Sequence, residues 1–186
     1  MISEPANGQE GDFHFSGYAS LFSIADLSND RVMMGAFHRS LQTRGVTGIR
    51  MLWNHDPAEP IGVWTAIDED ARGLRVTGRL TRGVTRSSAL RALIEDRAVD
   101  GLSIGFHTVR ADRPKGGSGR RLIEIDLWEI SLVAFPMQPG ARIDPPPLPV
   151  QPFLPGDQAT PATLQPAHLS QTSHALHASH TAKGHF

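Results

Sequence analysis

Three residues in separate segments of the chain have side chains that together could perform nucleophilic catalysis. Ser103 stands in GLSIGF, His55 in MLWNHDPAEP and Glu129 in DLWEISLV. A serine hydroxyl can attack a carbonyl carbon when an imidazole accepts its proton, and a carboxylate can hold that imidazole in one orientation. Because such a triad is defined by geometry rather than by chain order, the three residues are candidates for acyl transfer.

The segment around Ser103 has the pattern of a strand with one apolar face and one small face. Alternation places the three apolar residues at 102, 104 and 106 on one face and Ser103 on the other. Gly101 and Gly105 flank it and leave room for a substrate or for another backbone. The structural alternative is that a small residue is needed here for close packing between strands.

His55 and Glu129 occupy positions from which a sheet can aim a side chain at a cleft. His55 ends a strand-like run, and we expect a loop to begin at Asp56; the alternative is a half-exposed loop histidine bonded to Asp56. Glu129 lies in an apolar run, where a carboxylate is costly to bury unless it is paired. The alternative is that Glu129 and Ser131 mark the solvent face of a half-buried strand.

The elements that must position these residues are short strands with two or so helices. Alternation and turn residues predict a mainly β fold with a few helices (α+β), built as a compact, mostly antiparallel sheet or barrel. Ser87 or Ser88 is expected to cap the second helix. The predicted strands cover residues 13–22, 27–33, 49–55, 61–70, 73–81, 101–112 and 121–135, and the helices lie near 35–44 and 86–101.

Composition excludes several function classes. The chain has 186 residues, a formal net charge of -1 and no cysteine. There is no broad electrostatic case for binding nucleic acid or an anionic membrane, and disulfides, thiolate metal sites and cysteine nucleophiles are excluded. The N-terminus lacks the pattern of a secretory signal and no stretch is apolar enough to span a bilayer, so a cytoplasmic protein is expected.

The chain divides by composition into three parts. We predict a flexible N-terminus over residues 1–12, one folded domain over 13–143 and a Pro/His-rich disordered tail over 144–186. The tail histidines have irregular spacing and no accompanying cysteine, which favours adventitious metal binding over a metal site. We expect neither a metal nor another cofactor, and the tail is a candidate packaging or self-processing segment.

A series of motifs in one order resembles a known family. The segments GYASLF, GAFHRSL, LWNHD followed by IGVW, GLSIGF and DLWEISLVAFP span about residues 13–143. This series is similar to the prohead maturation proteases of tailed bacteriophages and gene transfer agents, which are serine endopeptidases similar to the herpesvirus assemblins. The resemblance implies an assemblin-like β-barrel, with the protease domain over 13–143.

The resemblance also implies roles and partners. The family histidine falls on His55, the nucleophile on Ser103 and the third triad member on Glu129. The implied substrates are the major capsid protein, scaffolding protein and the protease itself, cut inside the immature capsid in the cytoplasm of the bacterial host. A weak homodimer is expected, because the assemblins are restrained until they dimerise.

Two other function classes remain open from the residues alone. A catalytically silent β-barrel scaffold or structural module of the capsid would use Ser103 only for packing. A metal-dependent hydrolase would use His55, Asp56 and His107, although no familiar metal-ligand spacing is present. His107 shares strand parity with Ser103 but lies about 6 to 7 Å along the strand, so we assign it, with Gly101 and Gly105, to the flanks of the site.

Overall fold

The strands that carry the candidate residues belong to one sheet. The structure is a computed structural model that describes residues 12–114 and 116–145. Within these ranges the helices are α1 (His38–Arg44), α2 (Thr85–Glu95) and the short 3-10 helix η1 (Val46–Gly48). The strands are β1 (His14–Leu21), β2 (Arg31–Val32), β3 (Arg50–Trp53), β4 (Asp56–Glu69), β5 (Gly73–Leu80), β6 (Gly101–Asp112) and β7 (Arg121–Val133).

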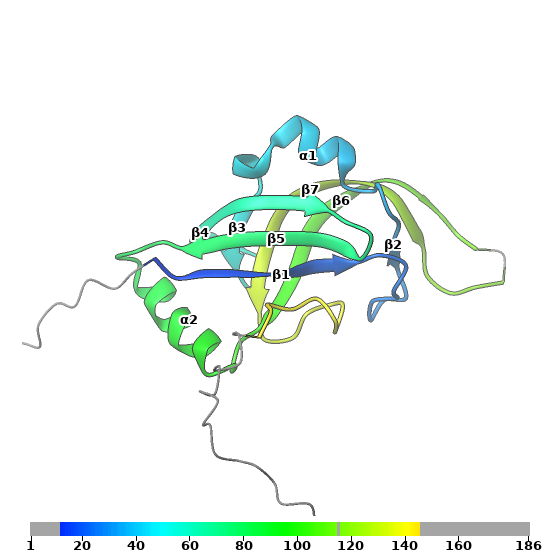
Figure 1. Cartoon of the computed structure of the whole chain (residues 1–186). Coiled ribbons are helices and arrows are strands. Elements are labelled where there is room, and N and C mark those ends of the chain that lie inside the picture. Colours follow the sequence, from blue (N-terminus) through cyan, green and yellow to red (C-terminus); the bar gives the residue numbers. More distant parts are fainter. Residues whose placement is uncertain (1–11, 115, 146–186) are drawn as a thin grey trace, which may run out of the picture. The chain divides into compact units, whose positions relative to one another are not determined.

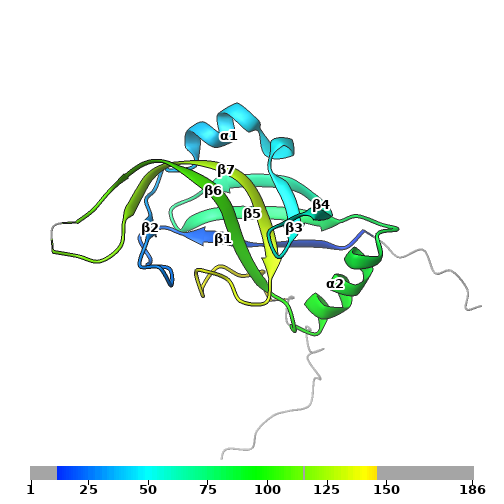
Figure 2. The same cartoon turned by 180° about the vertical axis from the view of Figure 1, so that it is seen from behind.

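The sheet is mixed and curled. Its strand order is β1-β5-β4-β3-β7-β2, and β6 pairs with β7 outside this path. The pairs β1–β5, β4–β5, β3–β4 and β6–β7 are antiparallel, whereas β7 runs parallel to both β3 and β2. Figures 1 and 2 show that the long β6–β7 pair crosses the direction of β1, β4 and β5, so that the sheet bends around its own core.

Alternation along β6 and β7 separates an apolar face from a small, polar one. Leu102 on β6 and Ile130 and Leu132 on β7 are fully buried. Burial of each such side chain stabilises the fold by about 1.5–3 kcal/mol. On the opposite face, Ser103 pairs with Ser131, so the apolar core holds rigid the two strands that present the candidate nucleophile.

A segment after β7 joins the two ends of the curled sheet. Ile143 forms a bridge with Gly17 of β1, and Arg142 forms one with Gly101 of β6. A Cβ atom on Gly17 would lie 2.3 Å from the Arg142 carbonyl oxygen, so only glycine permits this approach. The segment therefore closes the gap between β1 and β6 at the end where Ser103 lies.

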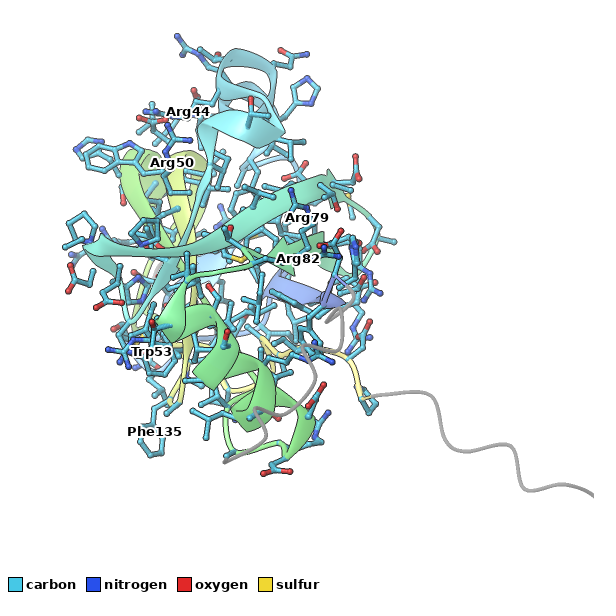
Figure 3. The ribbon with its side chains drawn as sticks, turned by 90° about the vertical axis from the view of Figure 1, so that its left-hand side faces the viewer. Arg44, Arg50, Trp53, Arg79, Arg82 and Phe135 are labelled. Carbon is cyan, nitrogen blue, oxygen red and sulfur yellow. The ribbon has the colours of Figure 1, made fainter. Side chains whose placement is uncertain are left out.

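The two helices pack on different parts of the sheet. Helix α1 lies against β7, where the Leu127 amide donates to Ser40 Oγ at 2.8 Å, and it ends at Gly45 with a positive φ of 63°. Arg44, in its last turn, is seen beside the strands in Figure 3. Helix α2 contacts β4 and β5. Neither α-helix, in the part of the chain that the structure describes, is long and apolar enough to cross a membrane.

The mainly β, mostly antiparallel fold with a few helices is confirmed, with two local corrections. The prediction of a loop from Asp56 is wrong, because β4 begins at that residue and forms a tight hairpin with β3. The predicted serine cap of the second helix is also wrong: Val84 precedes α2, and Ser87 instead donates to the Ile61 carbonyl at 2.6 Å. The sheet also has two parallel pairings, which the alternation pattern does not distinguish from antiparallel ones. Residues 1–11 and 146–186, with most of the predicted N-terminus and tail, lie outside the described residues.

Candidate active site

His55 is positioned by the two-residue turn that joins β3 to β4. Trp53 pairs with Asp56, and the two residues between them, Asn54 and His55, have positive φ angles of 51° and 61°. Two consecutive positive φ angles are the signature of the hairpin turn whose twist matches that of the flanking strands. Asn and His adopt this region more readily than most residues. Such backbone strain is common at functional sites, and here it fixes the place of the imidazole.

The imidazole of His55 is held by Glu129. Its Nδ1 atom lies 2.5 Å from Glu129 Oε1, although the residues are 74 positions apart in the chain. The parallel pairing of β3 with β7 brings them together, because Trp53 lies opposite Leu132 and the chain then turns back through His55 toward Ser131 and Glu129. With Nδ1 bonded to a carboxylate, Nε2 is the nitrogen left to exchange a proton with a substrate-facing hydroxyl.

Ser131 ties the histidine turn to the carboxylate. Its hydroxyl donates to Glu129 Oε2 at 2.6 Å and accepts the His55 backbone amide at 3.0 Å. Ser131 is fully buried, so the interpretation of Glu129 and Ser131 as a solvent face is wrong for this residue. Both carboxylate oxygens of Glu129 are thereby bonded, which fixes the carboxylate as well as the imidazole.

Gly105 leaves the space that the Glu129 carboxylate occupies. It lies directly opposite Glu129 in the β6–β7 register, and a Cβ atom there would lie 1.9 Å from Glu129 Oε1. No larger residue fits without moving the carboxylate. The glycine beside the candidate nucleophile is therefore explained by the position of the third residue.

Ser103 lies on the same face as these groups. It is directly opposite Ser131, and cross-strand neighbours in an antiparallel pair point to the same side. Ser103 is only 7% exposed. Among the described residues the Ser103 hydroxyl forms no side-chain hydrogen bond, either to His55 or to another residue. A small cavity of about 50 Å³ adjoins it, lined in part by Ile104, Phe106 and Met137.

The electrostatics of the pair favour a charged imidazole. The hydrogen bond to Glu129 raises the pKa of His55 above its ordinary value of 6.5, and the attraction of the carboxylate adds to this, while partial burial opposes it. A base whose pKa is raised holds a proton more strongly once it has taken it. The arrangement can thus stabilise an imidazolium that forms when a hydroxyl loses its proton.

Comparison with known proteins agrees with this chemistry. The model of one protein family, described as caudovirus prohead serine protease, matches residues 2–150. The chain belongs to this family. It is 38% identical over 146 residues to the prohead protease of Enterobacteria phage HK97, covering 76% of this chain and 63% of that protein. It is 30% identical over 102 residues to the capsid polyprotein of Pseudomonas phage PAJU2, covering 51% and 15% respectively. The chain therefore spans less than two thirds of the length of either relative.

Two herpesvirus proteases are similar at a lower level. A protease from KSHV, solved with a hexapeptide phosphonate inhibitor, has a TM-score of 0.46 and 14% identity over 72% of this chain and 64% of that one. The varicella-zoster virus protease has a TM-score of 0.44 and 14% identity, with coverage of 70% and 62%.

The flanking residues lie beside the site in this prohead protease family member. Gly101 pairs with Val133, and a Cβ atom on it would lie 2.5 Å from the Val133 oxygen, so glycine is needed for close packing there. His107 lies opposite Asp126 and is exposed, two pairs beyond Gly105. Neither residue bonds to His55 or Glu129 in the part of the chain described here.

The metal-hydrolase alternative does not match the geometry. Within residues 12–114 and 116–145, no three His, Cys, Asp or Glu side chains are grouped as metal ligands would be. Asp56 accepts the Ala58 amide at 2.8 Å, and His55 bonds to Glu129 instead of Asp56. His55 does lie in a turn with 43% of its side chain exposed, but the expected bond to Asp56 is wrong.

Sequence reasoning missed Ser131 as a participant. Ser131 lies two residues after Glu129, so strand alternation places both side chains on the same face. Its contact with the His55 amide, however, depends on the pairing of β3 with β7. A serine rather than an apolar residue in the run ISLV was the one available signal.

Proposed function

We propose that the chain is a serine endopeptidase of capsid maturation, in which Ser103 is the nucleophile, His55 the general base and Glu129 the orienting carboxylate. The observation that carries the proposal is the 2.5 Å contact between His55 Nδ1 and Glu129 Oε1 on the face that presents Ser103. Family membership supports the same reaction class.

The proposed reaction proceeds in two halves. Ser103 Oγ attacks the peptide carbonyl carbon while His55 Nε2 takes its proton, and the imidazolium then protonates the leaving amine as the C–N bond breaks. Water next attacks the acyl-serine ester, gives its proton to His55 and releases the new carboxylate, after which the proton returns to Ser103. Glu129 keeps the imidazole in one tautomer and stabilises its charged form throughout.

The proposed substrates are polypeptides of the immature capsid. One relative is named a prohead protease and another a capsid polyprotein, which supports cleavage of capsid or scaffold segments. Cleavage would take place inside the immature capsid in the bacterial host, and the protease itself is included among its substrates. A catalytically silent capsid module is the weaker candidate. One relative is named a protease, and a purely structural module does not require an imidazole that is held by a carboxylate.

A weak homodimer is proposed as the active form. An endopeptidase that acts inside a shell has to be restrained before it is concentrated there, and reversible association provides such restraint. Analytical ultracentrifugation gives the concentration range over which the dimer dissociates. The activity per protomer in a dilution series should fall over the same range. Full specific activity in a monomeric sample would contradict this part of the proposal.

Active-site labelling tests the assignment of the nucleophile without knowledge of the substrate. A fluorophosphonate reagent should add once to the wild-type chain, with the added mass on the peptide containing Ser103. Ser103→Ala should not be labelled, and Ser88→Ala, on an exposed part of α2, should be labelled like wild type. Labelling at another serine, or labelling of Ser103→Ala, would overturn the assignment.

A further inference from the structure

An exposed tryptophan stands beside the catalytic carboxylate proposed above. Trp128 is 53% exposed, although strict alternation would turn it to the side opposite Glu129, into the core. The register shifts here: Gly105 pairs with Glu129, whereas the next residue, Phe106, pairs with Leu127. The extra residue is Trp128, and a bulge of this kind turns two successive side chains to one face. The bulge therefore places the indole on the face that carries Ser103.

The indole is held in place rather than left free. Its Nε1 atom donates to Asp126 Oδ2 at 2.7 Å, and Arg44 of α1 bonds the same carboxylate through two nitrogens at 2.8 and 2.7 Å. The guanidinium and the indole together lower the pKa of Asp126 to about 2, so the carboxylate is charged at neutral pH. A large apolar side chain that is both exposed and fixed has the properties of a binding residue.

A cavity lies beside Asp126, the residue that accepts the hydrogen bond of the indole. It has a volume of about 480 Å³ and lies between α1 and the β6–β7 pair, with Val109, Asp126 and Arg44 among its lining residues. Val109 is 51% exposed and lies two residues beyond His107 on β6. A space of this size accommodates side chains of a bound polypeptide.

The charges around the cavity are already paired with one another. Arg39 bonds Glu124 at 3.1 Å, and Arg44 bonds Asp126 as described above. These partners leave little unpaired charge to select a charged ligand. The exposed indole of Trp128 is the apolar surface that remains for recognition beside the bulge, so the ligand chemistry that fits is a large apolar side chain.

The distance from the nucleophile sets which substrate residue reaches this surface. Gly105, opposite the bulge, is two residues from Ser103, which corresponds to about 7 Å along a strand. An extended peptide advances about 3.3 Å per residue, so a side chain two or three residues from the cleaved bond lies over the indole.

We propose that Trp128 forms a specificity subsite that binds a large apolar side chain of the substrate polypeptide, two or three residues from the bond that Ser103 attacks. The proposal rests on the protease function proposed above. It adds a selectivity determinant on the α1 side of the nucleophile, built from the bulge in β7.

The test uses the full chain and peptides that span a mapped cleavage site of the capsid protein. Trp128→Ala is expected to raise KM about tenfold with little change in kcat, because only binding is lost. Trp128→Phe should recover most of the affinity. Val109→Ala, six residues beyond Ser103 on β6, should match wild type, and so should Val63→Ala, at an exposed position on β4. Thermal unfolding of each variant verifies that the fold is intact.

A second arm changes the substrate. Replacing the apolar residue two or three positions from the cleaved bond by serine should raise KM for the wild type but not for Trp128→Ala. If wild type cleaves the peptides and Trp128→Ala has an unchanged KM, the subsite is refuted while the protease function stands. If wild type cleaves neither the peptides nor the intact capsid protein, the protease function itself is refuted, and the subsite with it.

Discussion

His55 Nδ1 lies 2.5 Å from Glu129 Oε1 because the strained two-residue turn between β3 and β4 lies beside the buried end of β7. Ser131 bonds both partners, and Gly105 leaves the space for the carboxylate. The relationship therefore depends on three segments of the chain, the turn, β7 and β6, rather than on two side chains alone. Each segment can be tested separately.

Glu129→Gln should shift the pH dependence of cleavage. The carboxylate raises the pKa of His55, and the base works only when it is neutral, so wild-type activity should appear above the ordinary histidine value. Removal of the charge lowers that pKa, and the acid limb of the kcat/KM profile should move to lower pH. The rate at the plateau should fall about a hundredfold or more, because the imidazolium loses its stabilisation. An acid limb that stays in place would show that Glu129 does not act on the base.

Gly105→Ala should inactivate the enzyme while leaving it folded. The new methyl group would meet Glu129 Oε1 at 1.9 Å, and the side chain can move away only by releasing His55. We expect kcat/KM to fall about a hundredfold. Gly117→Ala, whose Cβ would meet only the Pro114 side chain at 3.3 Å, is the matched control and should retain activity. Equal activity in both variants would show that the carboxylate position is not critical.

Ser131→Ala should weaken both stability and catalysis. It removes the acceptor of the His55 amide and the donor to Glu129, at a residue that is itself fully buried. The free energy of unfolding in urea should decrease by about 1–3 kcal/mol. The kcat should fall about tenfold, since the imidazole is still bonded to Glu129 but less firmly placed. Stability within error of wild type would contradict the role assigned to this hydroxyl.

Asn54 should tolerate glycine but not a β-branched residue. Its φ of 51° is accessible to Asn and Gly, while a β-branched side chain in this region costs about 1–2 kcal/mol. Asn54→Gly should keep near wild-type kcat/KM, and Asn54→Val should lower both the melting temperature and kcat. An active, fully stable Asn54→Val enzyme would mean that the turn does not fix His55.

The strand alternation around Ser103 could be read from the sequence, but the contacts that complete the site could not. The pattern in residues 101–106 correctly separates the buried Leu102 from Ser103, because side-chain direction along one strand is a local property. The position of His55 over Ser131 depends instead on the parallel pairing of β3 with β7, which brings together residues more than seventy positions apart.

The turn and the bulge show the same limit. The dipeptide Asn54–His55 lacks the glycine that usually marks such a hairpin turn, so the segment resembles the start of a loop. The exposure of Trp128 results from a register shift against β6, and strand periodicity alone would bury it. In both places the backbone departs from the regular pattern next to the residues proposed to do the chemistry.

Co-expression with its cognate capsid protein tests the central claim most directly. The measurement is the intact mass of that capsid protein after assembly with the wild-type chain or with Ser103→Ala, both verified to be incorporated and folded. The account predicts a capsid protein truncated at a defined peptide bond with wild type and full-length with Ser103→Ala. Full-length capsid protein in both samples, or the same truncation in both, would contradict it.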